Sequence, residues 1–432
     1  MKTLNNQNAV LVVSTYVIAT ALTQAYAQAP SGVLAAADQA DQADQADQAA
    51  PDSSYVSDVL EDPFGLRSGL AEQGITPEAT LIVDVSRNFA GGLHDAGTFR
   101  HLFDFSVLVD LETLAGVEGA TILIDFQTQE GQDGSAETGD LQAYSNIDAD
   151  DFTVLYELWY EQVFADGQLR FKIGKIDVNA DFAFVEYGGE FINSSAGFSP
   201  TILSMPTYPD PALGVLAFVE PGDGSFYAGA GVFDGATQQG KPTGGRGFGT
   251  LFDNPADLFL IAEAGARWTL GDLALPGRVG VGAWHHSGSF ARFDGGVEDG
   301  TAGFYLVLDQ MMYRENPADE ADEQGVGLFA QYGWADADVS AIEHHLGLGA
   351  QWVGPIPGRD DDVAGLMASA VLLSDEPGAG LTGDAETAIE LFYKVQITPR
   401  LSVKPDLQYI LDPGGVGLDD AWVGTLRIEI SY

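Results

Sequence analysis

Cysteine is absent from this chain of 432 residues, and its absence excludes thiolate catalysis, disulfide frameworks and cysteine-based zinc sites. Histidine is also scarce. Four of the six histidines form two adjacent pairs, His285-His286 and His344-His345, within segments that have the pattern of strands. Neighbours on a strand point to opposite faces, so neither pair can bind one metal ion together. We therefore expect no cofactor and no metal centre.

Basic residues are few, and long apolar runs are absent after the N-terminus. Eighteen lysines and arginines stand against 64 aspartates and glutamates, for a formal net charge of -46 at pH 7. So acidic a chain repels phosphate backbones, and we expect no nucleic-acid partner. No segment after the N-terminus is apolar for long enough to form a membrane-spanning helix. If the mature chain lies in a membrane, it must therefore cross it as a barrel of strands.

The N-terminus has the pattern of an export signal. Lys2 precedes a mostly apolar stretch over residues 9–22, and Ala25-Tyr26-Ala27 matches a small-residue cleavage site. Because the apolar stretch is shorter than a bilayer span of about 20 residues, a signal peptide is favoured over an anchor helix. We expect residues 1–27 to be removed.

A low-complexity segment follows at residues 28–60. It contains tandem Ala-Asp-Gln triplets and few aromatic residues, so it cannot bury enough apolar area to offset the entropy of ordering. We expect an acidic, disordered extension. The triplets would tolerate a helix, but no apolar heptad supports a coiled coil. Residues 61–432 are expected to form one folded unit.

From Thr80 onward, apolar residues alternate with polar or small ones in short segments, a pattern that places one set of side chains on each face of a β-strand. Phe103 and Phe105, for example, share one face, and Asp104 lies on the other. Strands are expected to begin near Thr80, Arg100, Gly119, Phe152, Gly167, Pro211, Ser225, Asp257, Pro276, Ala302, Gly325, Ala341, Asp362, Ala385, Arg400 and Asp420. The even number, about sixteen, is typical of bacterial outer-membrane barrels.

The charged faces of these strands leave two all-β architectures open. In a sandwich the charged face would meet solvent, whereas in a large barrel it can line a wet lumen while the apolar face meets lipid. The export signal, the strand number and the aromatic-rich apolar faces favour the second. We therefore expect an all-β fold, a transmembrane antiparallel β-barrel of about sixteen strands.

Short segments from about Asp62 to the end of the chain share their order and spacing with one known family. They are residues 65–75 (GLRSGLAEQGI), 157–162 (ELWYEQ), 171–179 (FKIGKIDVN), 181–182 (DF), 191–194 (FINS), 309–313 (DQMMY), 354–362 (GPIPGRDDD), 405–410 (PDLQYI) and 413–415 (PGG). Each string is weak alone, but the ordered set is specific. On this basis the chain resembles the carbohydrate-selective porins of the OprB family.

The resemblance implies a porin in the outer membrane of a Gram-negative bacterium, through which small sugars diffuse, and it implies no enzymatic activity. Its partners would be small sugars, outer-membrane lipid and the membrane's insertion machinery, and a homotrimer remains open. Residues 214–218 (GVLAF) lack the basic residues expected on that strand, which bears on sugar preference more than on the pore.

The candidate solute contacts are charged wall residues and two tryptophans. A sugar offers hydroxyls for hydrogen bonds and a flat C–H face for an aromatic ring, and such residues could serve both. The pore-lining candidates are Glu157, Trp159, Glu161, Arg170, Lys172, Lys175, Asp177, Asn179, Glu263, Arg267, Trp284, Glu390, Lys394, Asp406, Gln408, Arg427 and Glu429.

Among these, Arg170 and Lys172 are predicted to lie on a strand beside that of Glu157 and Glu161, so that opposite charges face each other. The following segment, residues 175–193, is rich in glycine and phenylalanine, and we expect it to fold into the lumen as a constriction. Facing charges in a wet pore could bind sugar hydroxyls. The plainer alternative is that they only keep the lumen hydrated.

Other functions are less well supported by the sequence. The main alternative is a general porin without sugar selectivity, and a weaker one is a secreted β-rich carbohydrate-binding protein. A barrel lipase would need a serine beside a histidine, and no such nucleophile setting is recognisable. Residues 360–362 (DDD) suit a solvated turn better than a Ca²⁺ site, and residues 244–249 (GGRGFG) suit a loop.

Overall fold

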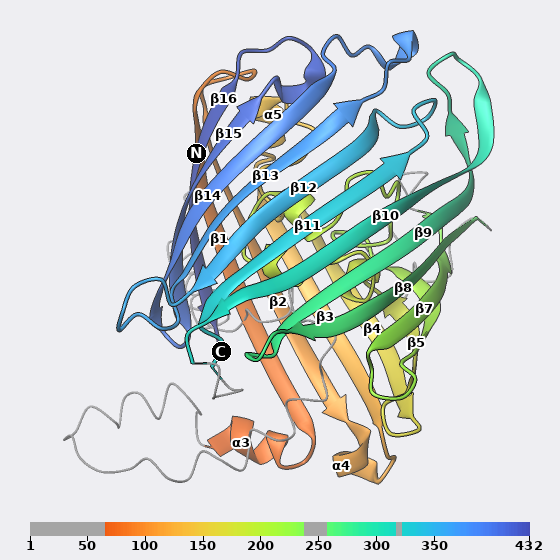
Figure 1. Ribbon diagram of the computed structural model, residues 1–432, viewed down its shortest axis with the longest axis vertical. Helices are drawn as coiled ribbons and strands as arrows, with labels where there is room; N and C mark the ends of the chain where they lie inside the picture. The colour runs from red at the N-terminus through yellow and green to blue at the C-terminus, as the bar shows by residue number, and fades with distance from the viewer. Residues whose placement is uncertain (1–64, 237–256, 317–321) are drawn as a thin grey trace, which may run out of the picture.

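The computed structural model describes residues 65–236, 257–316 and 322–432. Its strands form one closed antiparallel barrel, in which β1 pairs with β16 (Figure 1). The strands are β1 (Ile75–Ala90), β2 (Gly97–Asp110), β3 (Ala120–Gly131), β4 (Phe152–Phe164), β5 (Leu169–Ile176), β6 (Ala212–Val219), β7 (Phe226–Asp234), β8 (Leu258–Leu270), β9 (Leu275–Ala291), β10 (Val297–Arg314), β11 (Gly325–Ala335), β12 (Ile342–Val353), β13 (Val363–Leu373), β14 (Ala385–Thr398), β15 (Leu401–Leu411) and β16 (Ala421–Ser431). The predicted fold class is confirmed, and each predicted strand start lies on or close to one of these strands.

In the described residues the helices are short and lie before β1 or in the connections between strands. They are α3 (Leu66–Ala71), α4 (Leu111–Ala115), α5 (Ser135–Thr138) and α6 (Ser194–Gly197), with 3₁₀ turns η4 (Val178–Ala180), η5 (Glu186–Gly188), η8 (Pro377–Ala379) and η9 (Pro413–Gly415). Within the described ranges, no helix combines the length and apolarity that crossing a bilayer requires. The predicted signal peptide, the extension and the loop at residues 244–249 lie outside the described residues.

The connections differ in length between the two ends of the barrel. Residues 132–151 and 177–211 join strands at one end, whereas the turns 165–168, 271–274 and 399–400 lie at the other. Outer-membrane barrels have short turns on the periplasmic side and longer loops outside the cell. The end with the short turns, where β1 begins and β16 ends, therefore corresponds to the periplasmic side.

The alternation of side chains along each strand separates the inside of the barrel from the outside. On β2, Arg100 and Asp104 are buried against the interior, whereas Phe99, on the other face, is exposed. On β14, Glu390 is buried and Leu391 is 54% exposed. The charged faces thus point inward and the apolar faces outward, as a lipid-facing barrel requires and a sandwich does not.

The adjacent histidines follow the same rule. His286 and His345 are fully buried on the inner face, and their neighbours His285 and His344 lie on the outer face. His345 contacts the hydroxyls of two serines rather than a second histidine. Each pair is therefore divided between the two faces, as predicted.

Candidate functional site

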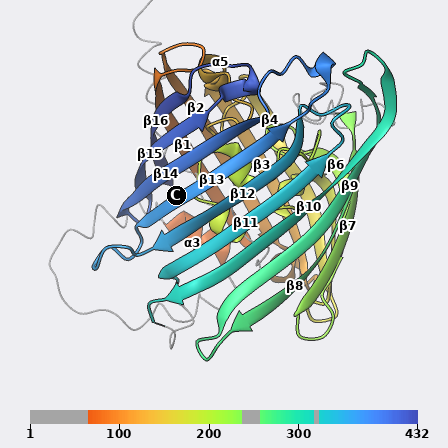
Figure 2. The ribbon, with the colours of Figure 1, turned by 45° about the horizontal axis from the view of Figure 1, so that its top comes forward.

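The connection between β5 and β6, residues 177–211, folds into the barrel and lies across its interior (Figure 2). Carboxylates of the inner wall accept hydrogen bonds from its backbone. Glu263 on β8 accepts one from Ala183 N at 3.0 Å, and Glu390 on β14 accepts one from Ile192 N at 2.7 Å. Because β8 and β14 lie on distant parts of the ring, the loop spans the lumen.

This loop confirms the predicted inward segment but corrects its bounds, because β5 runs to Ile176 and the loop reaches residue 211. Asp177 and Asn179 form its first turn, in which the Asp177 carboxylate accepts from Asn179 N at 2.9 Å. Lys175 still belongs to β5, is buried, and donates to the Leu155 carbonyl at 2.6 Å. All three candidates therefore make contacts with backbone, and Asp177 and Asn179 are in addition partly exposed.

Glycines on the inner face of the opposite wall make room for the loop. A Cβ atom at Gly327 on β11 would lie 2.1 Å from Cδ1 of Tyr187, and one at Gly333 would lie 2.1 Å from Oγ of Ser199. Neither distance is compatible with a real side chain, so a larger residue at either position requires the loop side chain that it meets to move.

Opposite charges meet where the loop leaves β5. Arg170 Nη1 lies 2.9 Å from a Glu161 carboxylate oxygen and 2.5 Å from Asp181 Oδ1, and Lys172 Nζ lies 2.9 Å from Asp181 Oδ2. Burial raises the pKa of Asp181, but Lys172 and Arg170 outweigh it and hold the pKa below its ordinary value. The predicted facing of β4 and β5 charges is present for Glu161, whereas Glu157 accepts a hydrogen bond from Asp177 N at 2.8 Å. Asp181, which we did not predict, is the group that joins both bases.

A second group of paired charges lies near the barrel closure. The carboxylate of Glu190, in the loop, lies 2.7 Å from Lys394 Nζ and 2.7 Å from Lys404 Nζ. Both ammonium groups also lie 3.5 Å from the carboxylate of Glu429. Burial raises the pKa of Glu190, but Lys404 and Lys394 outweigh it, so the carboxylate stays ionised. The loop is thus held by charge at two points, Asp181 near its start and Glu190 near its middle.

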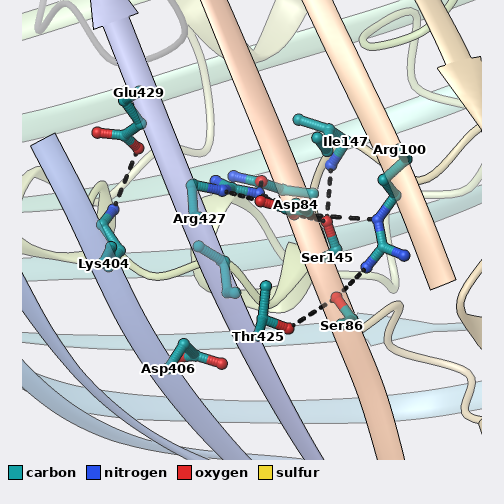
Figure 3. Close-up of polar contacts among 12 residues, drawn as sticks. Asp84, Ser86, Arg100, Ser145, Ile147, Lys404, Asp406, Thr425, Arg427 and Glu429 are labelled. Carbon is teal, nitrogen blue, oxygen red and sulfur yellow. Dashed lines mark hydrogen bonds and ion pairs between the residues drawn. The ribbon is translucent and has the colours of Figure 1, made fainter. Parts of the chain in front are cut away.

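The connection between β3 and β4, residues 132–151, also enters the barrel and meets the closure of β1 on β16 (Figure 3). Arg427 donates to both oxygens of Asp84, each at 2.8 Å, and Ser145 donates to Asp84 Oδ2 at 2.7 Å. Arg427 Nη2 also donates to Asn146 Oδ1 at 2.8 Å. One carboxylate therefore joins the first strand, the last strand and an inward loop.

Gln408 connects the two inward loops. Its Nε2 donates to the Tyr144 carbonyl at 2.7 Å and to Asp406 Oδ1 at 3.2 Å, and its Oε1 accepts from Asn193 Nδ2 at 3.1 Å. Tyr144 and Asn193 belong to different loops. Gln408 and Asp406, both predicted to line the pore, are buried beneath these contacts.

Both tryptophans chosen as stacking surfaces are covered. Trp159 is 5% exposed, and Lys172 Nζ lies over its ring at 4.4 Å; Trp284 is 2% exposed and belongs to the same apolar cluster. Phe182 and Phe191 of the loop are part of this cluster. Neither indole presents its face to the lumen, so the structure does not support the stacking role expected of them.

A cavity of ≈ 360 Å³ opens at the end of the barrel with the short turns. It is lined by both charge signs, including Glu186, Arg267, Arg278 and Asp309. Arg267 pairs with Glu220 at 2.8 Å, and Arg278 Nη2 lies 3.3 Å from Asp309. Of these four residues, only Arg267 was predicted to line the pore, although Asp309 is the first residue of one of the segments shared with the family.

A closed sixteen-strand barrel with an apolar outer face, charged inner face and inward loops defines an outer-membrane porin. The family model of the carbohydrate-selective porins, OprB family, matches residues 94–432, and the chain belongs to this family. It is a channel of the Gram-negative outer membrane and not an enzyme.

Individual relatives agree with this assignment. Porin B of Pseudomonas aeruginosa is 24% identical, over 89% of this chain and 92% of its own length. The high-pH structure of Pseudomonas putida OprB aligns with a TM-score of 0.75 and 19% identity, over 86% of this chain and 97% of that one. The low-pH structure of that protein aligns over the same shares with a TM-score of 0.55 and 17% identity.

Proposed function

We propose that monosaccharides and small oligosaccharides cross this barrel by facilitated diffusion, and that paired opposite charges along the inward loop set the preference for them. The observation that carries this proposal is the arrangement of four wall bases around two loop acids. Arg170 and Lys172 flank Asp181, and Lys394 and Lys404 flank Glu190.

The physical reason is that paired charges interact differently with sugars and with ions. Facing charges orient water and can exchange hydrogen bonds with sugar hydroxyls, and because the charges are already paired with one another, binding stays weak enough for release. A passage lined by one sign would instead concentrate counterions. The partly exposed side chains of Arg170, Glu190 and Lys394 are the contacts that a passing solute would meet.

A general porin without sugar selectivity is the second candidate, and strand β6 favours it. Its inward residues Leu216 and Phe218 are apolar and buried, at the place where the family pattern would put basic residues. Arg170 lies over the Phe218 ring at 4.7 Å, so one base from β5 reaches this part of the wall. The proposal therefore depends on the bases of β5, β14 and β15.

Planar-bilayer recordings of the purified protein separate the two candidates. A sugar-selective passage should show an ion current that falls saturably as a neutral monosaccharide is added, because bound sugar displaces ions. A general porin should show only the small, linear decrease that comes from the lower conductivity of sugar solutions. The linear result would contradict the proposal.

Export and assembly extend the proposal. Residues 1–27 act as a signal peptide, residues 28–60 remain an acidic extension, and the last strand guides insertion into the outer membrane. At its end Arg400 lies over the ring of the terminal Tyr432 at 4.5 Å. Deleting residues 428–432 should leave the protein periplasmic and degraded, and a normal outer-membrane yield would refute this role.

Oligomeric state is a separate part of the proposal. Because β1 closes on β16 within one chain, a homotrimer would contain three separate passages. Cross-linking in outer membranes should then trap dimers and trimers of this chain, whereas a single monomeric species would refute the trimer.

A further inference from the structure

Two carboxyl groups lie side by side inside the barrel wall, outside the charge pairs described above. Asp104 on β2 and Asp125 on β3 both point inward and are 8% and 2% exposed. In the register of the two strands, Asp104 lies opposite Gln127 and Asp125 lies opposite Ser106. The two carboxyls are close enough to hydrogen-bond to each other.

Oxygen atoms of residues that lie opposite Asp104, and one of Asp125 itself, lack donors in the described part of the chain. Gln127 Nε2 donates to Asp104 Oδ2 at 2.9 Å, which places the Gln127 amide at the pair. Yet Gln127 Oε1, Asp125 Oδ1 and Thr80 Oγ1 are buried with no hydrogen-bond partner among the residues that the structure describes. Thr80 lies directly opposite Asp104 in the register of β1 and β2. Strands β1 and β3 thus contribute buried oxygen atoms without a hydrogen-bond donor on either side of Asp104 of β2.

Electrostatics makes this arrangement costly without a positive charge. Two ionised carboxylates in contact repel each other, and Glu157 and Asp177 add to the negative field at Asp125. Lys175 attracts Asp125 electrostatically, but its Nζ donates to the Leu155 carbonyl. In the described part of the chain, no salt bridge links Asp125 to a basic side chain.

We propose that Asp104 and Asp125 bind a hard divalent cation of the Ca²⁺ type, with Gln127 and Thr80 supplying further oxygen ligands. A proton shared by the two carboxyls would relieve their repulsion but would satisfy a single acceptor. A cation satisfies several acceptors at once, and Ca²⁺ accepts carboxylate and amide oxygens in flexible geometry. Mg²⁺ fits less well because it demands a nearly ideal octahedron.

Such an ion would tie the first three strands of the barrel together. Thr80, Asp104 and Gln127 lie in one row across β1, β2 and β3, and Asp125 lies in the next. The cation would therefore stabilise the N-terminal part of the sheet, independently of which solute the pore admits.

The test measures heat stability and metal binding of the full-length protein in detergent. Wild-type protein stripped with a chelator should unfold at a higher temperature when Ca²⁺ is restored, because a ligand of the folded state stabilises it. The variant Asp125→Asn should lose this rise. Asp338→Asn is the matched control, since Glu298, Asp336 and Asp338 form a separate acidic group elsewhere on the barrel, paired with Arg292.

The outcomes distinguish a cation site from its alternatives. A Ca²⁺-dependent rise that survives in Asp125→Asn but disappears in Asp338→Asn would assign the ion to the other acidic group and overturn the proposal. No rise in the wild type would support a shared proton and would overturn it too. If Asp125→Asn does not fold, crystals of the wild type soaked in Tb³⁺ decide: an anomalous peak between Asp104 and Asp125 is expected, and its absence refutes the site.

Discussion

Asp84 and Arg427 face each other across the closure of the barrel, directly opposite in the register of β1 and β16 and joined by two hydrogen bonds of 2.8 Å. Both side chains are nearly fully buried. Their pairing fixes the register between β1 and β16, which are adjacent in the barrel but far apart in sequence. Ser145, from an inward loop, donates to the same Asp84 carboxylate. Closure of the barrel and entry of this loop are therefore linked.

Replacing Asp84 by Asn should destabilise the barrel, because Arg427 keeps its charge and loses its partner. Removing one member of a buried ion pair costs about 3–5 kcal/mol. The temperature at which the folded form unfolds on a detergent gel should fall clearly. Asp223→Asn, an exposed acid in the turn between β6 and β7, should leave it unchanged. Equal shifts in both variants would refute the role of the pair.

Changing Arg170 and Lys172 together to Gln should weaken block of the ion current by sugar and raise the preference for cations. The change removes two positive charges that face Asp181 and Glu161. Bilayer recordings measure both quantities, and Arg292→Gln serves as a control because its partners Asp294 and Asp338 lie in the connections between β9 and β10 and between β11 and β12. If cation preference rises while sugar block stays unchanged, these bases govern ions alone.

Acidification should weaken the ion pairs that hold the inward loop at Glu190. Burial raises the pKa of this carboxyl, but Lys404 and Lys394 outweigh it and hold the pKa below its ordinary value of 4.5. A group with a depressed folded-state pKa contributes stability above the unfolded pKa and loses it as the pH falls through the folded pKa. Open-channel current should therefore be steady near neutral pH and become noisier or larger well below pH 4.5.

The variant Glu190→Gln provides the control for this acid effect. It removes the charge at every pH, so its current should already show the altered behaviour at neutral pH and change less on acidification. Asp181 has the same direction of pKa shift and adds to the effect in both proteins. A pH response of Glu190→Gln identical to that of the wild type would place the acid-sensitive group elsewhere.

Replacing Gly327 by Ala should displace the loop, because the new Cβ would lie 2.1 Å from the Tyr187 ring. Overpacking of this kind costs roughly 1–3 kcal/mol. We expect a larger and less steady single-channel conductance. Gly69→Ala is the matched control, since a Cβ there would meet nothing within 4 Å. A conductance identical to the wild type would show that the loop does not restrict the passage.

The strands could be predicted from sequence because their signal is local. Alternation over Phe103, Asp104 and Phe105 fixes which residues share a face, and the structure places them so. The export signal, the strand number and the aromatic-rich apolar faces indicate which face lines the lumen, and the burial of Asp104 agrees. Neighbouring strands are close in sequence, so the facing of Arg170 and Glu161 could also be predicted.

The roles of individual wall acids could not be predicted, because their partners are distant in sequence. Glu263 accepts from Ala183 and Glu390 from Ile192, so both anchor a loop, although charge alone suggested contact with solute. Trp159 appeared suited to stacking, but the apolar residues of the same loop bury it. Alternation identifies an inward face, but it contains no information about what the interior holds.

Uptake of sugars of graded size into liposomes is the most direct test of the central claim, that this barrel is a sugar-permeable pore narrowed by its inward loop. Liposomes containing the protein should swell rapidly in a monosaccharide, more slowly in a disaccharide and hardly at all in larger oligosaccharides. The Gly327→Ala protein should extend that limit to larger sugars. Swelling no faster than that of empty liposomes, or equally fast in sugars of every size, would contradict the account.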